Sequence, residues 1–148
     1  MNDKYIIYFI SRTKASMIKF IENKLMQYKL NSLIPTHGNV LTALFESEKP
    51  LTMKDITKKI GKDKSSTTAL IHKLENLGYV KKQKSLDDKR ITYISLTDKA
   101  LEIKPAFDEI SYDVNRVSFS NFTDDEKIEF LRLLKKLSLN FKLENDKF

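Results

Sequence analysis

The chain has 148 residues, and its 27 Lys and Arg outnumber its 20 Asp and Glu, which gives a formal net charge of +7. The absence of cysteine excludes disulfides and thiolate metal sites, and two histidines are too few for a typical zinc site. No segment approaches the roughly 18 apolar residues of a membrane span, and the first residues lack a signal-peptide pattern. We therefore expect one cytoplasmic domain over 1–148, with no membrane partner, metal or cofactor and with a polyanionic partner.

The first predicted helix covers residues 4–29. Its apolar side chains recur at helical spacing: Ile6, Ile10, Met17, Ile21 and Leu25. Tyr5, Phe9 and Phe20 widen this stripe beyond what one small core can cover. The width predicts that this helix is buried against a second subunit as well.

Shorter helices follow at about 35–47, 53–60 and 64–77. Thr52 and Asp55 have the spacing of a capping box at the start of the second of these, and Gly61 is the residue type that ends such a helix. Asp63 is the expected N-cap of the third.

The predicted helix 64–77 has two chemically different faces. The residues spaced to face the core are Thr67, Leu70, Ile71, Leu74 and Leu77. The opposite face carries Ser65, Thr68, Ala69, His72 and Asn76. Because the outward residues near its start are small, this helix can approach the edges of DNA bases closely.

A basic hairpin is predicted after this helix. Residues 79–84 and 91–96 are rich in Val, Ile, Thr and Tyr on either side of a polar turn whose tip reads DDKR. Residues 51–90 carry 11 Lys and Arg against 5 Asp and Glu, a net charge of +6, so the rest of the chain contributes only +1. Such local basicity is typical of a surface that binds phosphate groups.

Long helices are predicted at about 98–120 and 124–144. Thr97 and Thr123 are the expected N-caps, and Pro105 predicts a kink or a break in the first helix. The apolar stripe of the first helix contains Leu101, Phe107, Ile110, Val114 and Val117. That of the second contains Ile128, Leu131, Leu134 and Leu137.

The order of short helices and a hairpin between long terminal helices resembles the MarR family of winged helix-turn-helix regulators. The resemblance rests on LTMKDITKKIGKDKSSTTALIHKLENLGYVKK (51–82), DDKRITYISLT (87–97) and PTHGNVLTALFE (35–46). It implies a mainly α fold with a small β-hairpin wing. The winged helix-turn-helix DNA-binding region would span 34–99, and long N- and C-terminal dimerisation helices would occupy 1–33 and 100–148.

The resemblance also implies a DNA-binding surface, with helix 64–77 in the major groove. The residues at positions that contact bases and nearby phosphates are Lys64, Ser65, Ser66, Thr68 and Ala69. Lys73 stands where a basic residue meets the DNA backbone. Asp88 would orient Arg90, which would reach the minor groove from the hairpin tip.

Several positions depart from the family's pattern. Ala69 stands where arginine is frequent, so it cannot bind guanine through two hydrogen bonds, and a thymine methyl group is the more natural contact. Ser85-Leu86 stands where an acid and a proline usually begin the tip. Thr67 replaces a β-branched apolar residue and must satisfy its hydroxyl group.

Plainer readings stay open for some candidates. Ser65, Ser66 and Thr68 are residue types common at helix starts, and Arg90 can be an ordinary solvated cation of a turn. The lysines that either bind phosphate or keep an edge strand soluble are Lys81, Lys82, Lys84 and Lys89. His37 and the aromatic residues of the long helices either line an effector pocket or belong to the core.

The sequence contains no catalytic set, because neither histidine lies near a plausible pair of nucleophile and acid, and we predict no enzyme. We predict a transcriptional regulator, more often a repressor in this family. It would bind double-stranded DNA as a homodimer on a pseudo-palindromic operator, with release by a small-molecule effector left open. The alternatives are a winged-helix protein-assembly module with only non-specific nucleic-acid binding, and an RNA-binding module, for which Tyr79 and Tyr93 are a thin stacking platform.

Overall fold

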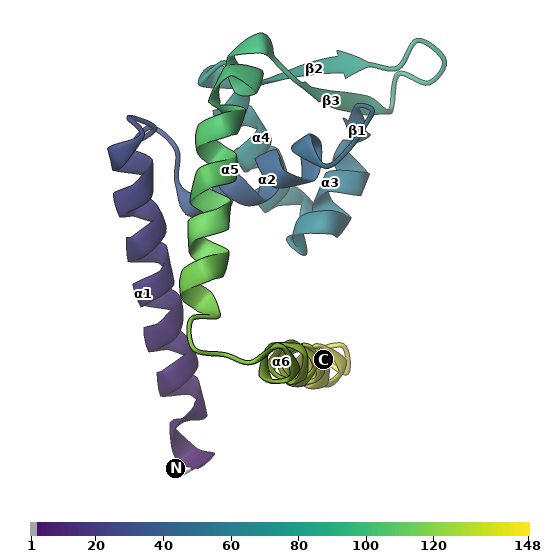
Figure 1. Cartoon of the computed structure of the whole chain (residues 1–148). Helices are drawn as coiled ribbons and strands as arrows, with labels where there is room; N and C mark the ends of the chain where they lie inside the picture. Colours follow the sequence, from purple (N-terminus) through teal and green to yellow (C-terminus); the bar gives the residue numbers. More distant parts are fainter. Residues whose placement is uncertain (1–2) are drawn as a thin grey trace. The chain divides into compact units, whose positions relative to one another are not determined.

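The computed structural model describes residues 3–148 and their side chains from residue 4 onward. The helical elements are η1 (Asp3–Tyr5), α1 (Ile6–Gln27), α2 (Pro35–Phe45), α3 (Met53–Ile60), α4 (Lys64–Asn76), α5 (Asp98–Ser118) and α6 (Asp124–Asn145). The strands are β1 (Leu51–Thr52), β2 (Val80–Lys84) and β3 (Thr92–Leu96). This mainly α fold with a small hairpin confirms the predicted fold class (Figure 1).

The chain divides into two compact units. The first ends at Ser111 and contains α1–α4, the strands and the beginning of α5. The second, Tyr112–Phe148, contains the end of α5 and α6. Among the described helices, none is both long and apolar enough to cross a membrane.

Local hydrogen bonds at the helix starts explain why the predicted caps are correct. The Asp55 N–H donates to Thr52 Oγ1 and the Thr52 N–H donates to Asp55 Oδ2, both at 3.1 Å. The same reciprocal pair joins Thr123 to Glu126 at the start of α6. Gly61 ends α3 with a positive φ of 65°, a conformation that glycine adopts without steric cost.

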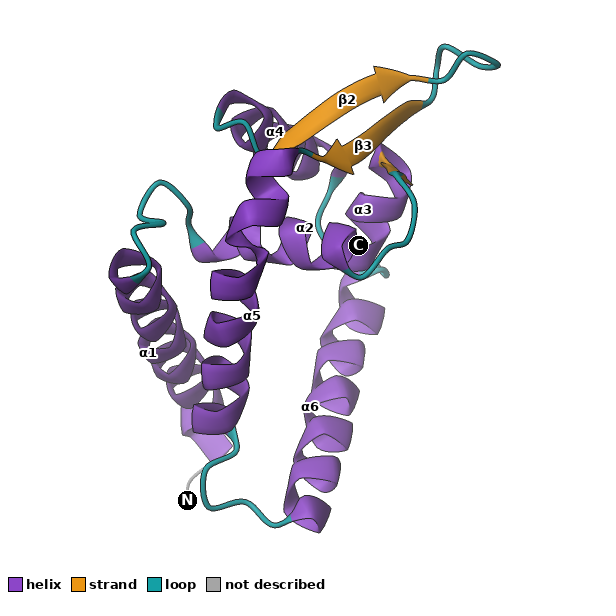
Figure 2. Ribbon diagram, turned by 45° about the horizontal axis from the view of Figure 1, so that its top comes forward, coloured by secondary structure: helices purple, strands orange, loops and turns teal. Residues whose placement is uncertain are grey.

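The three strands form an antiparallel sheet in the order β1-β3-β2. Leu51 lies opposite Ile94, and Val80 lies opposite Leu96. Figure 2 shows the β2–β3 hairpin extending away from α2, α3 and α4. Strand β1 was not predicted from the sequence, which indicated only a helix cap at Thr52.

An apolar core packs against the sheet and holds α2, α3 and α4 together. Side chains that are fully buried, with no exposed area, come from all three helices and from β3: Val40, Leu41, Ile56, Ile71, Leu74 and Ile94. Each such aliphatic side chain contributes roughly 1.5–3 kcal/mol by leaving water. This core fixes the position of α4 relative to the hairpin.

Some details of the long helices differ from the sequence-based predictions. Helix α1 ends at Gln27 rather than near residue 29, where Lys29 adopts a positive φ of 58°. The predicted break at Pro105 is wrong, because α5 is continuous through this exposed position, and Ala100 and Ile110 are buried on either side of it. Of the predicted apolar stripe of this helix, Ile110 is buried, whereas Leu101 is 53% exposed in the single chain.

Candidate nucleic-acid interface

The start of α4 is fixed by its N-cap residue, Asp63. The Ser66 N–H donates to Asp63 Oδ1 at 2.7 Å, and the Ser66 hydroxyl donates to Oδ2 at 2.8 Å. These hydrogen bonds, led by the one from the backbone, hold the pKa of the Asp63 carboxyl below its ordinary value. The predicted N-cap is confirmed, and the first turn of α4 has a defined geometry.

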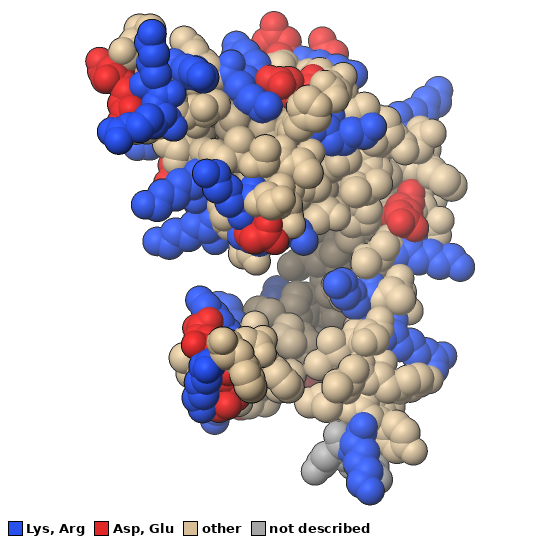
Figure 3. Space-filling model, turned by 180° about the vertical axis from the view of Figure 1, so that it is seen from behind, with Lys and Arg blue, Asp and Glu red and all other residues tan. Residues whose placement is uncertain are grey.

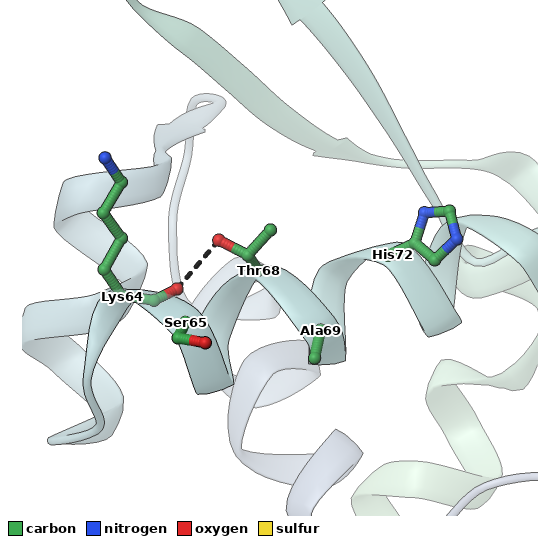
Figure 4. Close-up of a pocket in the computed structure, with 5 residues that line it drawn as sticks. All are labelled: Lys64, Ser65, Thr68, Ala69 and His72. Atoms are coloured by element: carbon green, nitrogen blue, oxygen red, sulfur yellow. Dashed lines mark hydrogen bonds between the residues drawn. The ribbon is translucent and has the colours of Figure 1, made fainter.

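The outward face of α4 is a shallow, open hollow (Figure 4). Its lining residues are Lys64, Ser65, Thr68, Ala69 and His72. All of them are exposed, as is Asn76, whereas Thr67, Ile71 and Leu74 on the opposite face are buried. Both predicted faces of this helix are therefore confirmed, although Leu70 and Leu77 are only half-buried.

The hydroxyl groups of α4 differ in what they can still donate. The Thr68 hydroxyl donates to the Lys64 carbonyl at 2.8 Å, and the Ser66 hydroxyl donates to Asp63. Both oxygens keep free lone pairs, so they can accept from base amino groups, but they cannot donate to a phosphate without breaking these bonds. The Ser65 hydroxyl has no hydrogen bond within the described part of the chain and can do either. The buried Thr67 hydroxyl is satisfied by the Asp63 carbonyl at 2.9 Å.

Asp88 holds Arg90 at the tip of the hairpin. The Arg90 guanidinium donates from Nε to Oδ1 and from Nη2 to Oδ2, each at 3.0 Å, and the Arg90 N–H also donates to Oδ1 at 3.0 Å. The two side-chain bonds lower the pKa of Asp88 and raise that of Arg90. The Arg90 side chain is nevertheless 91% exposed, so it is oriented but accessible.

Ser85 organises the rest of the tip. Its hydroxyl oxygen accepts from the N–H groups of Asp87 and Asp88, both at 3.3 Å. The Ser85 N–H donates to the Ile91 carbonyl at 2.9 Å, and the Ile91 N–H donates to the Asp88 carbonyl at 3.0 Å. The Ser85 hydroxyl is thus an acceptor that closes this turn.

The lysines of the hairpin and of α4 are not equivalent. Lys81, Lys84, Lys89 and Lys73 are exposed. Lys82 is exposed as well, but it pairs with Glu75 of α4, with Nζ 3.2 Å from Oε1. Figure 3 shows Lys and Arg side chains gathered around the hairpin, at the upper left of that view. The Lys82–Glu75 pair was missed from the sequence because it joins two elements and follows no local spacing rule.

His37 is buried and makes a structural contact. It is 3% exposed, and its Nδ1 accepts a hydrogen bond from the Ile34 N–H at 3.2 Å, which caps the start of α2. Burial, and secondarily the charge of Lys73, lower its pKa below the ordinary value. Phe107, one of the aromatic pocket candidates, packs on Phe45 with ring centroids 5.2 Å apart. These contacts favour the core reading for both residues.

Known proteins share this arrangement. A sequence model of the MarR family matches residues 32–91, which include α2, α3, α4 and the hairpin tip. The HTH-type transcriptional regulator SarZ of Staphylococcus haemolyticus is 32% identical over 114 residues, covering 76% of this chain and 74% of that protein. The chain belongs to the MarR family. Membership makes it a relative of winged-helix transcriptional regulators.

Solved structures of the MarR fold cover almost the whole chain. A MarR protein from Peptoclostridium difficile is 28% identical, with a TM-score of 0.81 over 97% of this chain and 92% of that one. MepR of S. aureus, solved in complex with DNA, gives a TM-score of 0.80 at 21% identity over 95% and 98%. PcaV of Streptomyces coelicolor, solved with its natural ligand, gives 0.80 at 19% identity over 90% and 92%. Because MepR and PcaV are only 21% and 19% identical to this chain, their structural similarity shows a shared fold and nothing more.

Proposed function

We propose that this MarR-family regulator is a homodimeric repressor that reads a pseudo-palindromic operator with α4 and the hairpin. The observation that carries the proposal is the exposed, small-residue face of α4, fixed by its N-cap and joined to a hairpin that presents Arg90. The solved complex of MepR with DNA supports the same use of a related fold.

Helix α4 and the hairpin would contact different grooves of the DNA. The outward face of α4 would lie in the major groove, where Ser65, Thr68 and Ala69 face base edges and Lys64 and Lys73 reach phosphates. Arg90 would enter the minor groove, whose negative potential attracts a guanidinium group. The exposed lysines of the hairpin would release counterions from the DNA backbone, so most of the affinity would depend on salt.

The terminal helices support a dimer. They expose large apolar side chains in the single chain, among them Ile6, Ile7, Phe9 and Ile10 on α1 and Leu131, Leu134 and Phe141 on α6. Helix α6 has no buried residue at all over its described length. Covering these side chains with a second copy would remove them from water and place two copies of α4 on successive half-sites.

A small molecule would act on this assembly by linkage. The natural ligand bound by PcaV supports an effector for a protein of this fold. A ligand that binds better to a dimer whose two copies of α4 have the wrong separation would weaken DNA binding by its preference for that state.

The proposal is tested by selecting duplexes from random DNA with the purified protein. Fluorescence anisotropy would then compare a selected duplex with a scrambled one, while sedimentation gives the mass of the free protein and of the complex. We expect enrichment of an inverted repeat, a dimer in both states and preferential binding that survives moderate salt. Failure to enrich any site, with equal and salt-sensitive binding to both duplexes, would favour the assembly-module alternative. Preference for single strands would favour the RNA-binding one.

A further inference from the structure

Leu86 is the most exposed apolar side chain of the hairpin. It is 92% exposed at the tip, where its neighbours are Ser85 and the charged residues from Asp87 to Arg90. Most large apolar residues exposed elsewhere lie on α1, α5 and α6, where a second copy would cover them, whereas Leu86 lies at the end of an extended hairpin. A leucine that is almost fully exposed gains little from folding, so the burial of its side chain is available to a partner that meets the hairpin tip.

The tip holds Leu86 in a defined place. The Ser85 hydroxyl accepts two backbone hydrogen bonds from the residues after Leu86, and the Ile91 carbonyl accepts one from Ser85. The Asp88–Arg90 pair closes the other side of the same turn. Because the turn is already ordered, presenting Leu86 to a partner costs little conformational entropy.

Charge and chemistry identify the partner. Residues 84–90 carry Lys84, Lys89 and Arg90 against Asp87 and Asp88, and the longer segment 51–90 that contains them has a net charge of +6, which fits a polyanion. The minor groove of DNA combines this negative potential with walls of apolar deoxyribose carbons, and apolar side chains inserted there part neighbouring base pairs. A leucine beside an arginine on one tip therefore matches both components of that groove.

We infer that Leu86 is an apolar wedge that enters the minor groove beside Arg90 and opens one base step of the operator. The inference rests on the proposed function and adds a determinant of specificity to it. Steps that unstack easily, a pyrimidine followed by a purine, would be preferred beneath the tip although no hydrogen bond reads them.

The test compares the parent chain with Leu86→Ser, which removes the apolar surface, and Leu86→Met, which keeps it. Each protein would be titrated with the duplex that the parent selects, at several salt concentrations. The duplex would carry 2-aminopurine at the step beneath the tip, so that its fluorescence rises when the base unstacks. Because Leu86 is almost fully exposed, thermal melting should confirm that both variants fold like the parent.

We expect Leu86→Ser to bind the operator roughly tenfold more weakly, because burying one leucine is worth that much or more. The salt dependence should stay unchanged, since leucine carries no charge, and the 2-aminopurine signal should be lost. Leu86→Met should bind within about twofold of the parent, since methionine keeps the apolar volume. In a second selection, Leu86→Ser should lose the enrichment of pyrimidine–purine steps.

Other outcomes would contradict the proposal that Leu86 acts as a wedge. Equal binding by the parent and Leu86→Ser, equal losses in Leu86→Ser and Leu86→Met, or no 2-aminopurine signal with the parent would each contradict it. A Leu86→Ser variant with normal DNA binding but weaker self-association in sedimentation would make Leu86 a protein contact instead. A parent chain that enriches no duplex would remove the proposed function and the wedge together, so the two failures are distinguishable.

Discussion

The ammonium group of Lys82 in β2 lies 3.2 Å from a carboxylate oxygen of Glu75 in α4. One ion pair thus ties the hairpin to the helix that carries the candidate base contacts. The same carboxylate would compete with DNA phosphates for Lys82.

Replacing Glu75 by glutamine should therefore strengthen DNA binding. Glu75→Gln removes a negative charge and frees Lys82, so we expect a few-fold higher affinity for operator and scrambled duplexes alike. The slope of log affinity against log salt should steepen by up to about 0.9, the contribution of one phosphate contact. Anisotropy titrations at several salt concentrations measure both. Glu22→Gln on α1, an exposed position, is the control of equal charge, and an equal gain there would contradict this role for Glu75.

Two variants of the hairpin tip should separate charge from orientation. Arg90→Ala removes the cation, so affinity for both duplexes should fall and the salt dependence should weaken. Asp88→Asn keeps the Arg90 charge but loses the carboxylate that orients it, so operator preference should fall while binding to scrambled DNA does not. Arg116→Ala on α5 removes a cation from another Arg–Asp pair and is the matched control. An operator preference in Asp88→Asn equal to that of the parent would show that orientation is irrelevant.

Position 69 should determine which base is read at one site in each half of the operator. Ala69→Arg places a fork of donors on the exposed face of α4, and we expect a new preference for guanine of about 1–3 kcal/mol at that site. Ala69→Gly removes the methyl group and should weaken any preference for thymine. Selection from random DNA with each variant measures the change, and an unaltered motif with Ala69→Arg would refute the assignment of this position to the groove.

Thr67 offers a test of the buried face of α4. Thr67→Val replaces a fully buried hydroxyl by a methyl group of similar size, and the Asp63 carbonyl still accepts the N–H of residue 67 at 3.1 Å. The free energy of unfolding should therefore change by less than about 1 kcal/mol. Thr67→Ala leaves a cavity and should cost about 1 kcal/mol or more. Urea unfolding at one protein concentration compares them, and a larger loss in Thr67→Val would mean that the hydroxyl matters more than the packing.

Stability should fall in mildly acidic solution because of His37. Burial lowers its pKa in the folded chain below the ordinary value of 6.5, so the unfolded chain binds more protons between the two pKa values. The free energy of unfolding should then decrease as the pH falls below about 6.5, and this contribution should level off below the folded pKa. His37→Asn should be less stable at about pH 7.5 but should show a flatter decline toward about pH 5.5. A variant that keeps the parent's decline would exclude His37 as its source.

Local sequence signals were sufficient for most of the fold. The caps at Thr52, Asp63 and Thr123 and the terminal glycine at position 61 act within four residues, and each is where the spacing predicts it. Features that depend on tertiary contacts were not predicted correctly. A two-residue strand such as β1 has no pattern of its own and exists only because β3 lies beside it. Pro105 does not break α5, because packing on either side of it outweighs one lost hydrogen bond.

For the candidate site, too, local sequence patterns predicted well and tertiary contacts were missed. The helical period placed Ser65, Thr68 and Ala69 on one exposed face correctly, because α4 is regular. The sequence could not show that the hydroxyls of Ser66 and Thr68 already donate within the chain, or that Lys82 is paired with Glu75. Those bonds depend on rotamers and on the approach of β2 to α4. The DNA contacts of all these residues stay predictions.

On α4 the hydroxyls of Ser66 and Thr68 already donate hydrogen bonds within the chain. This affects how many operators one genome would contain. The Ser66 and Thr68 oxygens can then only accept hydrogen bonds from bases, and Ala69 lacks polar atoms, so each half-site would be read through few direct hydrogen bonds. A recognition sequence with few specified letters recurs often by chance, so a regulator of this kind would occupy many promoters rather than one. The number of strongly enriched letters per half-site in the selected duplexes measures this directly, and a long, fully specified motif would contradict it.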